Sequence, residues 1–487
     1  MSASGSEQRL IKLALFGGVF AAALLTSALS GAAWSSSASP GPSTSAPAEG
    51  AWSAQVIGPG RGQMEPCGCS GGQLGGVDRL STALAMTPHA GLPVGPRFAA
   101  GGVVALEAEP HLPWAAAQLE IFWQAFPTLG FDAVGVASSE LPQLDRFGEL
   151  RFLLGETELV ATNLQAPGLP GAPEALARSE GVVMLAFLPA GLSGSVQLPA
   201  PETPEGAEDA PAPAPIAWRT TEPLEALQAL ADAGQWDPSE PTLAFFEGER
   251  AGAEALAERL SPESFVLRVA DEMEASATAG EGTAVLEVGS RLRQVLRLSG
   301  GVPEYMRVRE QRVFEDMPGD ASVTFLKGAY RSWLEYYDAR AAVADSLPSE
   351  GTYVGDQACI ACHTSQHEIW SASAHAHAWK TLQEDLRDGV PATVDPRCVT
   401  CHTSGYGRVG GFGSAVHSEE LRWSPESPLV DVSCETCHGP GQAHVTTADK
   451  TKIDRGGEFT CLQCHDAEND PDFRYAEKWP LIEHLNR

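Results

Sequence analysis

The sequence predicts an α/β layered sandwich domain followed by a mainly α, loop-rich domain. Three observations support this prediction. Between Trp52 and about Gly300, short apolar β-type runs alternate with helical stretches, which is typical of layered α/β domains. Between Thr352 and Arg487 the pentapeptide Cys-x-x-Cys-His occurs four times. At 487 residues, the chain is long enough for two or three domains.

Residues 1–33 have the pattern of a signal peptide or signal anchor. Arg9 and Lys12 precede an uncharged apolar run, Leu13 to Leu29, and small residues follow it. The run is near the lower limit for a membrane span, so an uncleaved anchor is the alternative to cleavage. We therefore expect a periplasmic or otherwise extracytoplasmic protein, soluble or N-terminally membrane-anchored. Residues 34–51 are rich in Ser, Ala and Pro and predict a flexible linker.

The α/β domain is expected at 52–327, a helical connector at 328–351 and the second domain at 352–487. The strand candidates are Ala54–Ile57, Val103–Leu106, Ala133–Val136, Leu159–Thr162, Val182–Phe187, Thr242–Phe246, Phe265–Val269 and Ala284–Val288. The helix candidates are Trp114–Phe126, Leu224–Ala233 and Ala251–Leu260. Pro199–Pro215 predicts an exposed loop. One helix face is expected from Tyr330, Trp333, Leu334 and Tyr337.

Each Cys-x-x-Cys-His motif predicts covalent attachment of a c-type haem. The two thiols add across the haem vinyl groups, and the histidine binds the iron as proximal ligand. The four sites are Cys359, Cys362 and His363; Cys398, Cys401 and His402; Cys434, Cys437 and His438; and Cys461, Cys464 and His465. Zinc bound by paired thiolates is the alternative, but such sites do not require the histidine that follows every pair. The sequence therefore predicts four covalently bound haem c groups.

The Met and His content of the second domain limits which residues can be the remaining iron ligands. All seven Met lie at or before Met317, so no haem in the second domain can have a Met ligand from that domain. Each iron is then bound by two histidines, bound by one histidine and a weaker ligand, or open on one side. Six further histidines are present in this domain: His367, His375, His377, His417, His444 and His484.

The formal net charge of −31 argues against nucleic acid as a partner. An acidic electron carrier would be steered towards a basic patch on a redox partner protein, although the charge can equally serve solubility. A membrane contact is expected only through the N-terminal anchor.

The second domain resembles the cytochrome c-554 family. The resemblance rests on Tyr353-Val354-Gly355, His375-Ala376-His377, Gly405-Tyr406-Gly407 and the stretch from Cys434 to Gly441. It implies a compact fold with closely stacked haems, three with two histidine ligands and one five-coordinate. The distal ligands that it implies are His375, His444 and His484.

The local sequence is compatible with these distal ligands. Gly439-Pro440-Gly441 is a turn that could direct His444 to a haem other than that of His438. An iron bond would fix His484 in the terminal segment. His375 and His377 face different directions on a helix, so one of them at most reaches a given iron. For His367, His377 and His417, an exposed or hydrogen-bonded role is the simpler expectation.

The first domain resembles calcineurin-like metallophosphatases of the 5′-nucleotidase type. The resembling stretches are Glu65–Gly76, Phe131–Leu141 and Leu159–Leu164. The family holds two metals with Asp, His and Asn ligands, but the position expected to read Gly-Asn-His-Glu is Ala137-Ser138-Ser139-Glu140. His89 and His111 lie in no such motif. We expect a phosphatase-like scaffold without a dimetal site.

Cys67 and Cys69 flank Gly68 in a glycine-rich stretch. In an oxidising compartment they could form a disulfide, bind a soft metal or act as a redox pair. A structural turn is the alternative.

These observations lead to three functional hypotheses. An exported electron-transfer cytochrome with a non-hydrolytic scaffold domain is favoured. A haem enzyme acting on a small nitrogen or sulfur oxo-species at an open iron is the alternative, and a phosphoesterase the third. The residues that would be catalytic are not identifiable from the sequence.

Overall fold

The computed structural model describes residues 52–60, 75–86, 95–101, 113–198, 213–269, 277–278, 283–288, 294–300, 307–314, 316–345, 347–348, 352–387, 390–466, 469–470 and 473–484. Several predicted features lie outside these residues: the signal and linker segments, the strand Val103–Leu106, Cys67 and Cys69, His89, His111 and most of the loop Pro199–Pro215.

Two six-stranded sheets form the centre of the α/β region. The first has the order β15-β14-β1-β2-β3-β4, with β1 (Trp52–Ile57), β2 (Arg97–Ala99), β3 (Ala133–Gly135), β4 (Glu158–Val160), β14 (Gln294–Gly300) and β15 (Arg307–Arg312). The second has the order β12-β13-β11-β10-β7-β6, with β6 (Ala177–Ser179), β7 (Val182–Phe187), β10 (Thr242–Phe246), β11 (Phe265–Val269), β12 (Ala277–Thr278) and β13 (Ala284–Val288). Strands β1 to β4 run parallel, as do β7, β10, β11 and β13, which is typical of sheets covered on both faces.

The two sheets bury their facing side chains against each other. Trp52 and Val56 of β1 share one apolar cluster with Phe245 and Leu267 of the second sheet. The rings of Trp52 and Phe265 meet edge to face, with centroids 5.8 Å apart. This face-to-face packing is the layered sandwich predicted from the alternating runs.

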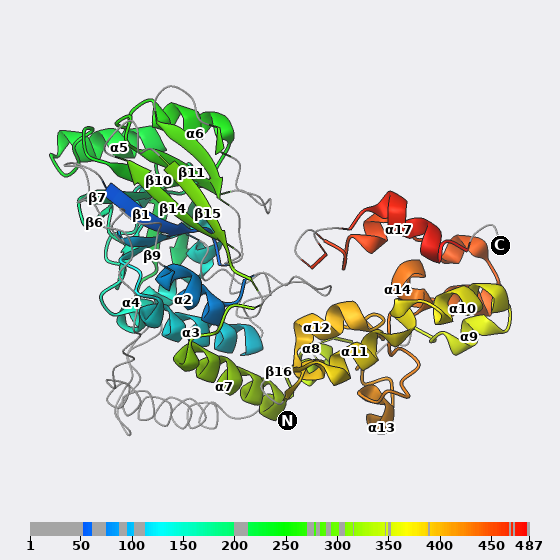
Figure 1. Ribbon diagram of the computed structural model, residues 1–487. Helices are drawn as coiled ribbons and strands as arrows, with labels where there is room; N and C mark the ends of the chain where they lie inside the picture. The colour runs from blue at the N-terminus through cyan, green and yellow to red at the C-terminus, as the bar shows by residue number, and fades with distance from the viewer. Residues whose placement is uncertain are drawn as a thin grey trace, which may run out of the picture. The chain divides into compact units, whose positions relative to one another are not determined.

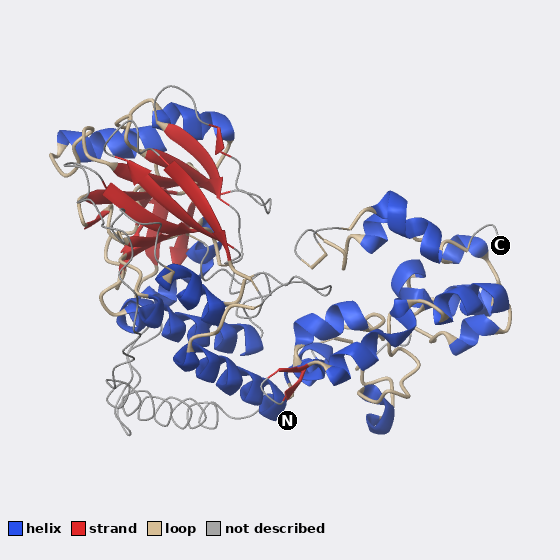
Figure 2. Ribbon diagram, in the orientation of Figure 1, coloured by secondary structure: helices blue, strands red, loops and turns tan. Residues whose placement is uncertain are grey.

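Helices cover the outer faces of both sheets (Figures 1 and 2). Helices α5 (Pro223–Asp232) and α6 (Arg250–Ala257) pack on the second sheet and bury Leu227, Leu230 and Leu256. Helices α2 (Val77–Ala85), α3 (Pro113–Leu129) and α4 (Phe147–Leu154) pack beside the first sheet. The α/β layered sandwich is therefore confirmed, and each predicted strand or helix of this region that falls in the described residues lies on a strand or helix.

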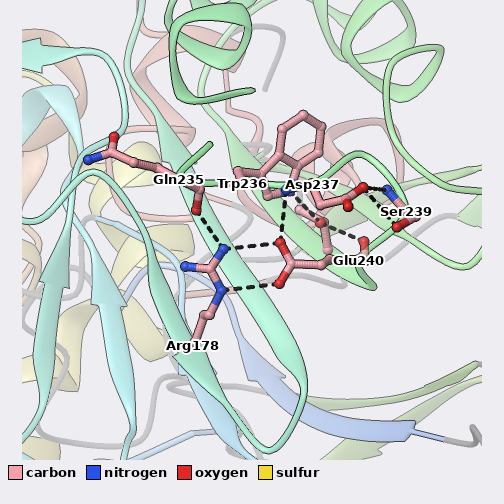
Figure 3. Close-up of polar contacts among 7 residues, drawn as sticks. Arg178, Gln235, Trp236, Asp237, Ser239 and Glu240 are labelled. Carbon is pink, nitrogen blue, oxygen red and sulfur yellow. Dashed lines mark hydrogen bonds and ion pairs between the residues drawn. The ribbon is translucent and has the colours of Figure 1, made fainter. Parts of the chain in front are cut away.

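A smaller antiparallel sheet completes this region, with the order β5-β9-β8: β5 (Leu164–Gln165), β8 (Ser193–Val196) and β9 (Ile216–Thr220). Side-chain contacts tie the edge of the second sheet to its connections (Figure 3). Arg178 of β6 donates to both carboxylate oxygens of Glu240, at 3.1 and 3.0 Å, and to the Gln235 carbonyl at 2.6 Å.

Helix α7 (Ala321–Tyr337) leads out of the α/β region, and α8 (Ala339–Asp345) follows it. The Asp320 side chain caps α7 by accepting from the Ser322 and Val323 amides. Tyr330 and Leu334 are buried, as their spacing predicted.

The C-terminal region consists of short helices and irregular loops, as predicted. Its elements are α9 (Gln357–Ile360), α10 (Thr364–Ser371), η2 (Ala374–His377), α11 (Ala378–Glu384), β16 (Leu386–Arg387), β17 (Val390–Pro391), η3 (Ala392–Val394), α12 (Pro396–His402), α13 (Glu419–Arg422), α14 (Cys434–His438), α15 (Gln442–Thr447), η4 (Lys450–Lys452), α16 (Glu458–Cys461) and α17 (Tyr475–Ile482). None of the helices in the described parts of the chain combines the length and the hydropathy that a membrane span requires.

A small apolar cluster lies beside the second motif. Trp379, Phe412 and Trp423 form consecutive ring contacts, with centroids 5.1 and 5.7 Å apart. The loop that carries Phe412 approaches itself so closely that a side chain at Gly411 would collide with the Gly405 carbonyl. The glycines of this loop therefore allow the chain to fold back on itself. Two of them, Gly405 and Gly407, belong to the stretches on which the cytochrome c-554 resemblance rests.

Candidate haem-binding site

The four motifs occupy helix termini or single-turn helices. The second lies within α12, which begins at Pro396 and is capped by the Asp395 side chain. The third is the whole of α14. The first and fourth begin at the ends of α9 and α16 and continue past them to the histidine. A helical turn places the two thiols and the histidine of a motif on neighbouring sides of one segment, which is the arrangement that attachment to a single porphyrin requires.

Glu435 joins the first and third motifs. It lies inside the third motif, is 2% exposed, and its carboxylate accepts from the Val354, Gly355 and Gly441 amides at 2.7–3.0 Å. The segment before the first motif and the turn after the third are thus held by one buried side chain. This role could not be predicted from the sequence, because nothing local distinguishes this glutamate from a surface residue.

Three proximal histidines each face one of the candidate distal histidines. The ring centroids are 6.2 Å apart for His363 and His444, 6.0 Å for His465 and His375, and 5.8 Å for His438 and His484. The partners in each pair come from different motifs or helices. The ring of His444, which follows the turn at Gly439–Gly441, lies against the ring of His363.

These separations fit an iron held between two imidazoles. Two imidazole nitrogens, each about 2 Å from one metal, place the ring centres roughly 6 Å apart. The fourth proximal histidine, His402, belongs to the second motif, and the three candidate distal histidines all face other rings.

Hydrogen bonds at Nδ1 orient several of these rings. Backbone carbonyls accept from Nδ1 of His402 (Ala378, 2.7 Å), His438 (Asp454, 2.8 Å), His444 (Asp449, 3.1 Å) and His484 (Ile482, 2.9 Å). Because a carbonyl can only accept, each of these Nδ1 atoms carries the proton. That tautomer leaves the Nε2 lone pair for iron, so the donor set suits haem.

Burial keeps two of the paired histidines in the ligand form. It lowers the pKa of His375, and the neighbouring His465 lowers that pKa further. Burial also lowers the pKa of His438. A neutral imidazole at neutral pH can bind iron without first losing a proton.

The cysteine thiols show which sites are neighbours. A hydrogen bond from Cys434 lowers the pKa of the Cys359 thiol, and one from Cys401 lowers that of Cys464. Burial raises the pKa of Cys437 to about 11, with the nearby Cys461 and Cys464 as further causes. The first site is therefore adjacent to the third, the third to the fourth, and the fourth to the second.

The other three histidines of this region lie elsewhere. His367 Nε2 is 3.8 Å from a carboxylate oxygen of Asp356. Burial lowers the pKa of His417, whose ring also bonds the Gly410 backbone. His377 lies near Asp431. Burial raises the pKa of the Asp431 carboxyl, and His377 partly offsets this rise. None of the three is in a ring contact with a proximal histidine among the contacts of the described residues, and their predicted non-ligand roles stay predictions.

In the α/β region, Glu140 and Asn163, from two of the stretches on which the phosphatase resemblance rests, make structural contacts. Glu140 accepts from the Ala137 amide at 2.7 Å. Asn163 is 1% exposed. Its side-chain N–H groups donate to the Leu188 and Thr221 carbonyls, both at 2.8 Å, and its side-chain oxygen accepts from the Leu188 amide at 2.9 Å. Within the described part of the chain, no three His, Cys, Asp or Glu side chains gather as a metal ion would need.

Comparison with known proteins gives a partial match for the C-terminal region. The profile of the family Cytochrome c554 and c-prime matches residues 358–439. Cytochrome c-554 from Nitrosomonas europaea is 34% identical over 107 residues, which are 20% of this chain and 42% of that protein. The chain thus spans less than half the length of this curated relative. The resemblance drawn from the sequence is confirmed for this region.

Solved structures similar to the chain include two phosphatase-type proteins. The 5′-nucleotidase precursor from Thermus thermophilus has 13% identity and a TM-score of 0.40, with 63% of each chain covered. The calcineurin-like phosphoesterase YfkN from Bacillus subtilis has 11% identity and a TM-score of 0.40, with 59% of this chain and 98% of that chain covered. These are the families that the first domain was expected to resemble. At such identities and scores the likeness says nothing of an activity for this chain.

Proposed function

We propose that this protein is an exported tetrahaem c-type cytochrome that transfers electrons, and that its α/β domain is a non-hydrolytic scaffold. The observation that carries the proposal is the set of three facing histidine pairs with separations of 5.8–6.2 Å. An iron with two histidine ligands exchanges electrons without changing its ligands, which suits relay. The adjacency of the four motifs adds a continuous path from the first site, through the third and fourth, to the second.

The first test is the haem count and redox behaviour of the mature protein. Intact mass should show four porphyrins attached to the polypeptide after expression in a host that makes cytochromes c. Stopped-flow mixing should show the haems reduced by dithionite and reoxidised by small acceptors. A chain without porphyrin, or haems that stay oxidised in dithionite, would refute the proposal.

A redox partner protein and an extracytoplasmic location are parts of the same proposal. The charge of −31 would steer the protein to a basic surface on the partner. Association with such a partner should therefore slow as the salt concentration rises. Fractionation of cells would test the location.

The second candidate function is a haem enzyme that acts on a small nitrogen or sulfur oxo-species. The rings of His375, His444 and His484 each lie against a histidine of another motif. None of these three is therefore left as a distal ligand for the haem of His402, and this favours the second function. If that iron is five-coordinate, the oxidised protein should give a high-spin paramagnetic resonance signal, and carbon monoxide should shift the absorption of one reduced haem. Four low-spin haems that are inert to carbon monoxide would exclude catalysis at an open iron.

A phosphoesterase activity is disfavoured. The sequence lacks the metal-binding motifs of the family, and Glu140 and Asn163 of the resembling stretches are held by backbone contacts. Hydrolysis of nitrophenyl phosphate in the presence of manganese, lost on chelation of the metal, would overturn this part of the proposal.

A further inference from the structure

The proximal histidines differ in what their Nδ1 atoms contact. His465 donates to a carboxylate oxygen of Asp470 at 2.8 Å. His402 and His438 donate instead to backbone carbonyls, at 2.7 and 2.8 Å. Of the second, third and fourth sites, the fourth is therefore the one whose proximal histidine donates directly to a carboxylate.

A carboxylate at Nδ1 changes the donor strength of the opposite nitrogen. A charge-assisted hydrogen bond polarises the Nδ1–H bond more than a bond to a neutral carbonyl does. The imidazole gains electron density at Nε2, and second-shell partners of this kind raise the basicity of a metal ligand. A stronger donor and a nearby negative charge both favour ferric over ferrous iron, which lowers the reduction potential.

The surroundings of His465 hold this contact in place. Its ring stacks on Phe473, with centroids 4.6 Å apart and an angle of 15° between the planes. His375 faces it at 6.0 Å. The side chains of His465 and Asp470 are 35% and 24% exposed, so water screens the pair less than it would on an open surface.

At two other sites a carboxylate reaches the proximal histidine only through a peptide group. The Ala378 carbonyl that accepts from His402 belongs to the peptide group between Ala378 and Trp379. The N–H of the same peptide group, on Trp379, donates to Asp431 at 2.7 Å. The peptide that accepts from His438 donates the Arg455 N–H to the Asp454 side chain at 3.0 Å. A peptide group passes on part of the polarisation, so these carboxylates should act more weakly than Asp470.

We propose that Asp470 acts through His465 to lower the reduction potential of the haem held between His465 and His375. The proposal rests on the haem attachment proposed above. Cys464 lies beside Cys401, and Cys437 lies near Cys461 and Cys464. A low potential at the fourth site would favour electron transfer from it to any neighbouring haem of higher potential.

The test compares the full-length, haem-loaded protein with its D470N variant. Asn is nearly isosteric and keeps an oxygen for the His465 Nδ1–H but removes the charge. Potentiometric titration followed by absorption and paramagnetic resonance should show one of the four haems shifted to higher potential while it stays low-spin. D470E should restore most of the original value, because a carboxylate is again present. D431N and D454N are the matched controls and should give smaller shifts, each at another haem.

The outcomes separate this inference from the proposed function. A wild-type protein with fewer than four haems would refute the tetrahaem proposal itself. Four haems with unchanged potentials in D470N would overturn the role of Asp470 alone. Loss of the low-spin signal of one haem in D470N would also overturn it, since Asp470 would then hold the ligand rather than tune it. Equal shifts in D454N and D470N would point to general surface charge and contradict the proposal.

Discussion

The two structured regions bury their residues in different ways. Strands β7 and β10 of the α/β region are buried at every position. In the C-terminal region, helices α9, α10, α15, α16 and α17 have no buried residue. The first region is therefore stabilised by apolar side chains packed against each other. The second has one small apolar cluster, and with four motifs in 136 residues the porphyrins would have to form much of its core.

This difference predicts the largest effect, which follows when haem attachment is prevented. Replacement of the eight motif cysteines by alanine should leave 352–487 largely unfolded, because cofactor-nucleated domains gain their folding free energy from the cofactor. The α/β region should stay folded. Limited proteolysis followed by mass spectrometry should then show cleavage throughout 352–487 and protection of the strands.

The haem-loaded wild-type protein is the control and should be protected in both regions. A haem-free protein that resists proteolysis in 352–487 would show that side chains alone determine this fold. That result would remove the contrast between the two regions.

The next effect concerns the packing between the two sheets. Phe265 is 1% exposed and its ring meets Trp52 edge to face. Phe265→Ala should lower the free energy of unfolding of the α/β region by about 3–5 kcal/mol, the usual cost of truncating a buried aromatic residue. Denaturant unfolding followed by circular dichroism would measure this loss, while the haem absorption spectrum should stay unchanged.

Phe152 provides a matched control, because it lies in the same region and is 77% exposed. Phe152→Ala should change stability by at most about 0.5 kcal/mol. An altered haem spectrum in Phe265→Ala would mean that the two regions depend on each other more than their separate cores suggest.

Much of this contrast could be predicted from the sequence. The alternation of apolar runs identified strands such as β7 and β10, since a central strand must be apolar on both faces. The pairing of β1 with β14 could not be found in this way, because no local pattern records a partner so far away along the chain. Contacts of this kind depend on the whole fold.

The haem-binding region shows the same division. The motifs predicted four proximal histidines, and the family resemblance implied His375, His444 and His484. The structure places these three against three of the predicted proximal histidines. The roles of Glu435 and Asp470 were missed. Both are ordinary acidic residues in sequence. The fold brings Glu435 to the Val354 and Gly355 amides, which lie far earlier in the chain, whereas Asp470 follows His465 closely and no motif marks the pair.

A smaller effect is expected from Glu435, which tests how far protein contacts contribute to the haem region. Glu435→Ala would leave the Val354, Gly355 and Gly441 amides without their buried acceptor. The haem-loaded protein should lose about 1–3 kcal/mol of stability, the cost of unsatisfied buried donors. Glu435→Gln, which keeps an acceptor oxygen, should lose less. Denaturation followed by haem absorption would measure both variants.

The control for this site is Glu477→Ala, because Glu477 is an exposed residue of α17 in the same region. It should be close to neutral. If Glu435→Ala is equally neutral, the haems alone hold the first and third motifs together.

The smallest effect is a pH dependence in the α/β region. The hydrogen bond from Arg178 lowers the pKa of Glu240 below the ordinary value of 4.5. Because the folded-state pKa is the lower one, this contact stabilises the fold above about pH 4.5, and the contribution is lost as pH falls through the folded-state pKa. E240Q should therefore be less stable than the parent at neutral pH, and the difference should shrink in acid. E254Q, which removes the exposed partner of Arg250 on α6, should leave the pH dependence unchanged. Equal slopes for E240Q and the parent below about pH 5 would mean that this contact, visible in Figure 3, adds nothing to the stability of the sheet edge.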